Sequence, residues 1–310
     1  MSKLNEGRVA VITGAGRGIG REHALLLAEG GARIVVNDLG AQSDGTGADA
    51  GPANEVAEQI RAMGGEAVVN GADISTMAGA QGLIRQAVDE FGRLDILINN
   101  AGILRDRMVF SMSEDDWDAI MAVHLKGTFA TTHHASVYWR EQSKAGQSFD
   151  ARVINTTSPS GIYGNVGQTN YGAAKAGIAA FSVIAAMELA RYGVTVNCVA
   201  PAALSRLTAG LMGAAAQDEA LKEAMSPRWI AVLVAWLASP EARHVTGRVF
   251  DVRGESLAIA EGWVRGPSAT QPDDPTKLGP VVADLMARAR LNSDMSGHEA
   301  EGPGRPSHTI

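Results

Sequence analysis

A glycine-rich turn near the start of the chain constrains its fold more than any other feature. The apolar run Arg8–Ile12 suits a buried parallel strand and leads directly into Thr13–Gly20 (TGAGRGIG), which a helical pattern over His23–Glu29 follows. In this order, glycines let the backbone approach a diphosphate, and the helix N-terminus favours its negative charge. The alternative is a turn with a structural role only. We interpret the context as a nucleotide-binding βαβ unit.

The second predicted strand, Arg33–Asn37, ends at Asp38, which lies 18 residues after Gly20. A carboxylate at that place can accept hydrogen bonds from the ribose hydroxyls of a dinucleotide, and it repels a 2′-phosphate. The position therefore predicts NAD rather than NADP; the alternative is a polar strand end. Residues 40–52 are expected to form a flexible loop over the adenosine end of the cofactor.

Strands and helices alternate along the rest of the chain. This pattern predicts a single-domain, doubly wound parallel sheet (a Rossmann fold) over residues 1–265. We expect further strands at 66–70, 94–98, 152–155, 194–199 and 247–251, and helices at 54–63, 80–91, 114–140 (interrupted at Gly127), 171–191 and 228–238. Ligands of such sheets bind at the carboxyl ends of the strands. The residues that follow predicted strands are the glycine turn, Asp38, Asn100, Ser158 and Pro201.

Ser158, Tyr171 and Lys175 are the candidate catalytic residues. Tyr171 and Lys175 are four residues apart in a predicted helix, so they lie on one face, one turn apart. An ammonium group beside a phenol favours the phenolate and lowers the phenol pKa from about 10. Such a phenol can exchange a proton with a substrate oxygen near neutral pH, and the Ser158 hydroxyl can hold the same oxygen. A Tyr-x-x-x-Lys pattern is also a common coincidence, so it counts only beside the nucleotide-binding pattern.

Composition and charge exclude several other classes. The 310 residues are 45% hydrophobic with a net charge of −7, which is typical of a globular enzyme and unlike most nucleic-acid-binding proteins. The longest apolar run, Trp229–Ala238, is too short to cross a bilayer, and the first residues lack a signal-peptide pattern. With Cys198 as the only cysteine, a cytoplasmic location is expected. Adjacent His133 and His134 do not share a helix face, so we expect no metal site.

Three motifs in order and spacing resemble those of the short-chain dehydrogenase/reductase family over residues 7–256. They are Thr13-Gly14-x-x-x-Gly18-x-Gly20, Asn99-Asn100-Ala101-Gly102 and Ser158…Tyr171-x-x-x-Lys175. Within the family, the chain is most similar to the (3R)-hydroxyacyl-CoA dehydrogenase part of the multifunctional β-oxidation enzyme type 2. The stretches behind that similarity are 37–40, 99–107, 123–127, 160–165 and 200–208.

The resemblance implies a role for each matched residue. Tyr171 would be the acid/base, Lys175 would lower its pKa and hold the nicotinamide ribose, and Ser158 would position the substrate oxygen. The residues expected to contact the cofactor are Gly14, Gly18, Ile19, Gly20, Asp38, Asp73, Ile74, Asn100, Tyr171, Lys175 and Pro201, of which Asp73 and Ile74 would flank the adenine.

Two positions depart from the common family pattern. Many members have asparagine where this chain has His124, and the backbone of that asparagine holds a water in a proton relay behind the lysine. We predict that the relay survives through the His124 backbone carbonyl, and a buried structural histidine is the alternative. After Pro201, Ala202 replaces a glycine and Thr208 comes later than the usual threonine, so the contacts at the nicotinamide end are less well defined. Tyr163 lies between Ser158 and Tyr171 and is a further candidate to face the substrate.

The resemblance implies NAD-dependent oxidation of a secondary alcohol, most closely a 3-hydroxyacyl-CoA thioester. The alternatives are a hydroxysteroid, terpenoid or other small-alcohol dehydrogenase of the same family, or a nucleotide-binding regulator without turnover. We expect a homodimer or homotetramer, a small-molecule substrate, and neither nucleic acid nor a membrane as a partner.

The C-terminal stretch extends beyond the length usual for the family. Residues 266–275 read as a linker, 278–291 as one amphipathic helix and 293–310 as a disordered tail. The helix is expected to pack on a partner subunit or to border the active site. The loop 203–226 is expected to form much of the substrate wall.

Overall fold

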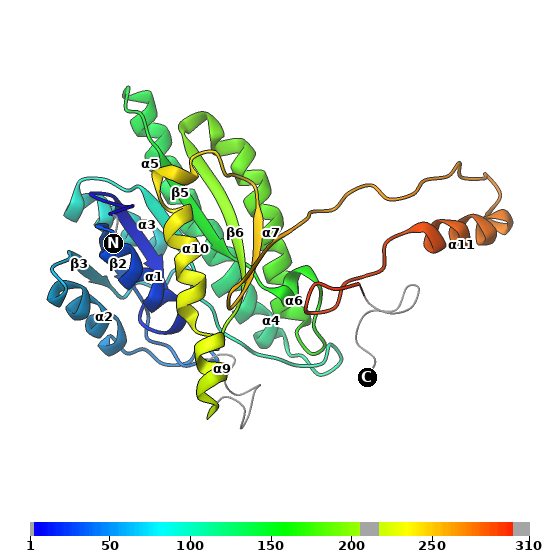
Figure 1. The fold of residues 1–310 in the computed structure, drawn as a ribbon, viewed down its shortest axis with the longest axis horizontal. Coiled ribbons are helices and arrows are strands. Elements are labelled where there is room, and N and C mark those ends of the chain that lie inside the picture. The colour runs from blue at the N-terminus through cyan, green and yellow to red at the C-terminus, as the bar shows by residue number, and fades with distance from the viewer. Residues whose placement is uncertain (1–2, 205–216, 300–310) are drawn as a thin grey trace.

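The computed structural model describes residues 3–204 and 217–299, and its centre is one eight-stranded sheet with strand order β3-β2-β1-β4-β5-β6-β7-β8 (Figure 1). All neighbouring strands are parallel except β7 and β8, which form an antiparallel hairpin. The strands are β1 (Val9–Thr13), β2 (Arg33–Asn37), β3 (Ala67–Asn70), β4 (Ile96–Asn99), β5 (Ala151–Thr156), β6 (Val194–Ala202), β7 (Val249–Arg253) and β8 (Ser256–Ala260).

Helices cover both faces of the sheet. Alternate side chains of each strand point to opposite faces, so Ala10 and Ile12 of β1 pack beneath α1, α2 and α10, whereas Val9 and Val11 pack beneath α3, α5 and α7. The α-helices are α1 (Gly18–Glu29), α2 (Gly51–Ala62), α3 (Met77–Phe91), α4 (Glu114–Ile120), α5 (Gly127–Lys144), α6 (Pro159–Ile162), α7 (Thr169–Leu189), α9 (Glu219–Ala224), α10 (Pro227–Leu237) and α11 (Leu278–Arg288).

The predicted doubly wound architecture is confirmed, with two local corrections. Strand β7, the last strand that was predicted, extends further at its carboxyl end than expected. The chain then turns at Gly254 (φ +52°) into β8, which was not predicted. The helix expected over 114–140 contains a six-residue π-helix, η1 (Met121–Lys126), between α4 and α5. Helix α5 begins at Gly127, where a Cβ would lie 2.2 Å from the Ile74 Cδ1 atom, so a larger residue would displace the Ile74 side chain in the turn after β3.

Helix α7 is long and apolar enough to cross a membrane by length and composition alone. It packs along β5 and β6 and buries Ala185, Ala186 and Leu189 against the sheet. The chain here is a core helix whose outward face is also apolar.

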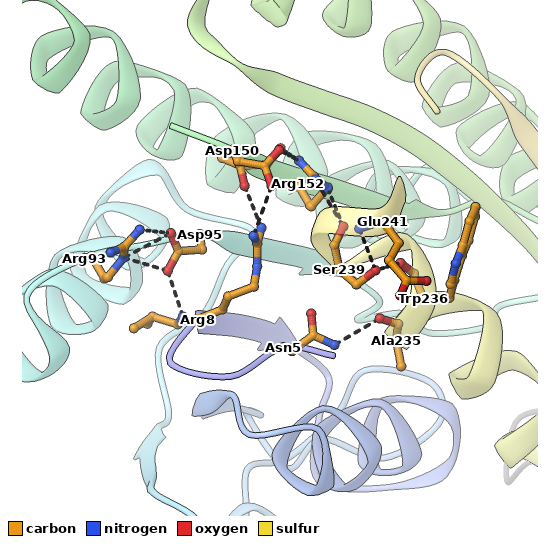
Figure 2. Close-up of polar contacts among 12 residues, drawn as sticks. Asn5, Arg8, Arg93, Asp95, Asp150, Arg152, Ala235, Trp236, Ser239 and Glu241 are labelled. Atoms are coloured by element: carbon orange, nitrogen blue, oxygen red, sulfur yellow. Dashed lines mark hydrogen bonds and ion pairs between the residues drawn. The ribbon is translucent and has the colours of Figure 1, made fainter. Parts of the chain in front are cut away.

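A polar cluster closes the amino-end edge of the sheet, opposite the edge where the candidate site lies (Figure 2). The guanidinium of Arg152 is fully buried; it donates to the Ser239 carbonyl oxygen at 3.0 Å and pairs with the Asp150 carboxylate at 2.6 Å. Arg8 donates to the Asp150 carbonyl oxygen at 2.6 Å. Burial and the neighbouring Arg152 lower the pKa of Arg8, while the carboxylates of Asp95 and Asp150 oppose that shift. Asp150 therefore compensates two guanidinium groups at once.

We expect Asp150→Asn to lower the free energy of unfolding by about 2 kcal/mol, because it leaves Arg8 and Arg152 under-compensated. Breaking a fully buried pair costs roughly 3–5 kcal/mol, and the smaller figure allows for the half-exposed Asp150 side chain. Urea denaturation measures the change. Glu141→Gln removes an exposed ion pair with Lys144 and should cost about 0.5 kcal/mol or less. Equal effects of the two substitutions would contradict this interpretation of the cluster.

The C-terminal stretch leaves the body of the molecule and returns to it. Residues 261–275 run outward to α11, which has no buried residue and stands apart from the sheet in Figure 1. Residues 293–299, predicted to be disordered, return to the body, where the Arg253 guanidinium donates to the Met295 carbonyl oxygen at 2.9 Å. The rest of the predicted tail, from residue 300, lies outside the described residues.

Candidate active site

One cleft of about 410 Å³ lies along the carboxyl-end edge of the sheet. Its walls come from the turns after β1, β2, β3, β4, β5, β6 and β7, and it spans the place between β1 and β4 where the strand order reverses. Ligands bind at such a reversal because the connections on its two sides run to opposite faces of the sheet and leave a crevice. The residues predicted from strand ends therefore converge on one site.

The glycine turn forms one end of the cleft. Gly14 has φ +63°, and a Cβ there would lie 2.7 Å from the Ala101 Cα atom, so the close approach of the two turns requires glycine. The Asn100 side-chain amide donates to the carbonyl oxygens of Thr13 and Gly14, each at 3.1 Å. Asn100 thus fixes the shape of the turn as well as lining the cleft.

Asp38 stands at the carboxyl end of β2, held by two backbone amides. The Gly16 amide donates to one carboxylate oxygen at 2.8 Å, and the Gly40 amide donates to the other at 2.7 Å. A Cβ on Gly16 would lie 2.9 Å from the same carboxylate. The carboxylate is therefore preorganised beside the glycine turn, as its predicted role requires.

Ser158, Tyr171 and Lys175 all line the middle of the cleft. Ser158 follows β5 and caps α6, where its hydroxyl accepts from the Ser160 amide at 3.2 Å. Tyr171 and Lys175 lie one turn apart on α7, and the Lys175 Nζ atom is 5.6 Å from the Tyr171 ring centroid. The buried Lys175 ammonium donates to the Thr156 carbonyl oxygen at 2.6 Å, which holds it in the cleft wall. The structure thus brings the predicted set together.

The electrostatics of Tyr171 differ from the sequence-based expectation. Burial raises the pKa of the phenol to about 12, and hydrogen bonding with Ser158 only partly opposes that rise. Burial also lowers the pKa of Lys175 to about 8. In the protein alone, desolvation of the phenolate is the largest effect on the pKa of Tyr171. An oxidised nicotinamide ring bound in the cleft would add a positive charge that favours the phenolate.

His124 lies at the cleft wall within the π-helix η1. Its Nε2 atom is 2.8 Å from the Ile103 carbonyl oxygen and 3.1 Å from the Ile103 amide nitrogen, and its ring meets the Tyr171 ring edge-on at 5.1 Å between centroids. Burial lowers the pKa of His124 to about 3, so the imidazole is neutral at neutral pH. A Cβ on Gly102 would lie 2.5 Å from the imidazole Cε1 atom. These contacts tie His124 to the turn after β4 and to Tyr171, and its relay role stays a prediction.

The remaining predicted residues divide into three groups. Gly18, Ile19, Asp73, Ile74 and Pro201 line the cleft. Gly20 lies behind it, where a Cβ would be 2.1 Å from the Gly14 carbonyl oxygen, so its role is to let α1 pack against the turn. Tyr163 is absent from the cleft lining, since its hydroxyl donates to the Asp251 carboxylate at 3.0 Å. Residues 205–216, which include Thr208 and half of the predicted substrate wall, lie outside the described part of the chain.

Sequence reasoning missed two residues that line the cleft, Arg253 and Met295, whereas Met225 belongs to the loop 203–226 that was predicted as the substrate wall. Met225 precedes α10, Arg253 ends β7 and Met295 belongs to the returning C-terminal segment. The strand-end rule would have found Arg253 if the last strand had been extended by two residues. No local pattern marks Met295, because its place depends on contacts with distant segments.

Comparison with known proteins agrees with the geometry. Residues 8–217 match the model of the short chain dehydrogenase family. The chain is 44% identical to the hydroxyacyl-CoA dehydrogenase ChsB1 of Mycobacterium tuberculosis, over 91% of this chain and 89% of that protein. It is 43% identical to the peroxisomal multifunctional enzyme type 2 of Drosophila melanogaster, over 94% of this chain but only 46% of that longer protein. A crystal structure of a short chain dehydrogenase from Mycobacterium avium superposes with a TM-score of 0.84 at 50% identity, covering 93% of this chain and 98% of that one.

The fold, the cleft and the three matched motifs all lead to one assignment. The resemblance noted in the sequence is confirmed by matches that cover most of the chain. Enzymes of this kind are oxidoreductases that act on CH–OH groups with a nicotinamide cofactor. The chain belongs to the short-chain dehydrogenase/reductase family.

Proposed function

We propose that the enzyme is an NAD-dependent (3R)-hydroxyacyl-CoA dehydrogenase. The observation that carries the proposal is the placement of Ser158, Tyr171 and Lys175 in one cleft of a chain that is 44% identical to a protein named hydroxyacyl-CoA dehydrogenase. The similarity to multifunctional enzyme type 2, which extends over nearly the whole of this chain, supports the same substrate class.

The residues present fit a nicotinamide dinucleotide. Gly14 lets the turn lie against Ala101, Gly16 lets it lie against Asp38, and the Asp38 carboxylate is held in place beside the turn. Asp73 and Ile74 lie farther along the same half of the cleft, where we place the adenine. A fixed carboxylate near the ribose favours NAD over NADP because it would repel a 2′-phosphate.

The chemistry assigned to the chain is proton transfer and positioning. The bound cofactor supplies the hydride acceptor. The Ser158 hydroxyl holds the substrate oxygen. The Tyr171 phenolate takes the proton of the substrate hydroxyl as hydride leaves the carbon that bears this hydroxyl, so the alcohol becomes a ketone. Lys175 stabilises the phenolate and holds the nicotinamide ribose. His124 keeps the turn after β4 in place against Tyr171.

A panel of alcohols tests the assignment by NADH formation. We expect (3R)-hydroxyacyl-CoA thioesters to be oxidised with a higher kcat/KM than their (3S) isomers, hydroxysteroids or terpenoid alcohols. A hydroxysteroid or terpenoid oxidised in preference to every thioester would replace the proposal by its alternative within the family. Tight NADH binding with no turnover of any alcohol would favour a regulatory role.

We also propose that the enzyme is a homodimer or homotetramer located in the cytoplasm. Helix α7 exposes Val183, Ile184 and Met187 on its outward face, and α11 exposes Val282 and Met286, so both present apolar surface suited to a second copy. Light scattering after size-exclusion chromatography should give a dimer or tetramer, and deletion of residues 266–310 should weaken the assembly. Unchanged mass, stability and KM after that deletion would show that residues 266–310 have no role in assembly. Fractionation of the source cells tests the location.

A further inference from the structure

Arg253 marks the end of the cleft farthest from Asp38. It is the last residue of β7, and five strand spacings separate β7 from β2, a distance of about 24 Å. Tyr171 and Lys175 lie between these ends, since α7 packs along β5 and β6. The dinucleotide of the proposed function would occupy the cleft from Asp38 to Lys175. Arg253 therefore borders the half that is left for the substrate.

The neighbours of Arg253 combine apolar surface with an available positive charge. Met225 and Met295 line the same end of the cleft with flexible thioether side chains, which suit apolar parts of a substrate of variable shape. Arg253 uses one N–H group on the Met295 carbonyl oxygen, and in residues 3–204 and 217–299 no carboxylate forms an ion pair with it. The nearby Asp294 carboxylate accepts from the backbone amides of Ser296 and His298, and its charge attracts Arg253 without an ion pair between them.

The other cations lining the described cleft have different partners. Arg17 lies on the glycine turn, 3.9 Å from the Asp49 carboxylate, in the half that binds the dinucleotide. Lys175 is buried and donates to a carbonyl oxygen beside Tyr171. Arg253 is thus the lining cation, within the described part of the cleft, that an anionic substrate would meet at the substrate end.

We propose that Arg253 forms an anion subsite that binds a phosphate group of the CoA part of the substrate. The inference rests on the proposed function, since only a thioester of CoA brings phosphates to this end of the cleft. A guanidinium is always charged and presents paired N–H donors that match two phosphate oxygens. The subsite would recognise the CoA carrier independently of the acyl group.

The test compares two substrates with the same 3-hydroxyacyl group, one carried on CoA and the other on pantetheine, which lacks the phosphates. We expect Arg253→Gln to lower kcat/KM for the CoA thioester by about 10- to 100-fold, mostly through KM, since hydrogen bonds between charged groups contribute roughly 1.5–3 kcal/mol. For the pantetheine thioester, the same substitution should change kcat/KM by less than about 2-fold. Arg253→Lys should recover part of the loss.

Arg248→Gln is the matched control, because Arg248 is exposed just before the amino end of the same strand and carries the same charge. Arg248→Gln should leave kcat/KM unchanged for both thioesters. Equal losses on both thioesters, or no loss on the CoA thioester, would overturn the subsite. If the wild-type enzyme oxidises only other alcohols, the proposed function has failed. In that case free CoA should inhibit the oxidation of those alcohols, and Arg253→Gln should weaken this inhibition about 10-fold or more if the subsite exists. Absence of inhibition by CoA would overturn the subsite.

Discussion

Replacing Tyr171 by phenylalanine should lower kcat by roughly 100-fold or more while leaving the dissociation constant for NADH within about 3-fold. The substitution keeps the ring that packs edge-on against His124 and removes only the oxygen that exchanges the proton. General acid/base catalysis contributes about 10²- to 10⁴-fold, which sets the expected size. Stopped-flow or steady-state NADH formation with the best thioester measures it.

Tyr163→Phe is the matched control for that loss. Its phenol is bound to Asp251 outside the cleft lining, so we expect kcat within a few fold of the wild-type value. Near-normal turnover of Tyr171→Phe, or equal losses in the two variants, would remove Tyr171 from the acid/base role.

The pH dependence of the wild-type enzyme should follow the ionisation of Tyr171. Oxidation needs the phenolate, so kcat/KM for the alcohol rises with pH until the phenol is ionised. Reduction of the ketone needs the neutral phenol, so kcat/KM for the ketone falls over the same pH range. Burial raises the pKa to about 12 in the protein alone. The pH at which oxidation levels off therefore reports how far Lys175 and the bound cofactor lower that pKa. A pH profile that is flat from 6 to 10 in both directions would contradict this assignment.

Asp38→Ala should shift the preference between NADP and NAD, expressed as a ratio of kcat/KM values, by about 100-fold or more toward NADP. Two unit charges about 4 Å apart near a protein surface interact with about 4 kcal/mol, and a 2′-phosphate would meet the Asp38 carboxylate at that kind of distance. The substitution removes this repulsion together with the hydrogen bonds to the ribose hydroxyls, so NAD should bind less well and NADP better.

Asp89→Ala removes the same charge from the exposed face of α3, where Asp89 pairs with Arg85. It should leave the cofactor preference unchanged, which separates the local carboxylate from the net charge of the protein. A wild-type enzyme that already uses NADP better than NAD would contradict the argument before any variant is made.

The features that the sequence predicted correctly are those written in a short stretch of chain. The bounds of β2 were predicted to the residue, and Asp38 follows it as expected, because an apolar run that ends in polar residues marks a buried strand. Tyr171 and Lys175 share a helix face because their spacing of four fixes it. The order of strands and helices was enough for the sheet and for the edge at which the site lies.

The features that the sequence did not predict depend on distant contacts. The antiparallel β8 follows a turn at Gly254 that resembles many other glycine positions. The π-helix places His124 against Ile103, and no local pattern distinguishes it from an ordinary helical turn. The pKa of Tyr171 was expected to fall because Lys175 is near, whereas burial of the phenol, a property of the folded cleft, raises it. Met295 reaches the cleft from a segment predicted to be disordered.

A crystal structure of the enzyme with NAD and a 3-ketoacyl-CoA tests the central claim most directly. We predict that the Tyr171 phenol oxygen lies about 2.5–3.0 Å from the ketone oxygen, with the Ser158 hydroxyl on the same atom and the nicotinamide ring over the adjacent carbon. A ketone oxygen bound by other groups, with the Tyr171 oxygen turned away from the cofactor, would contradict the account.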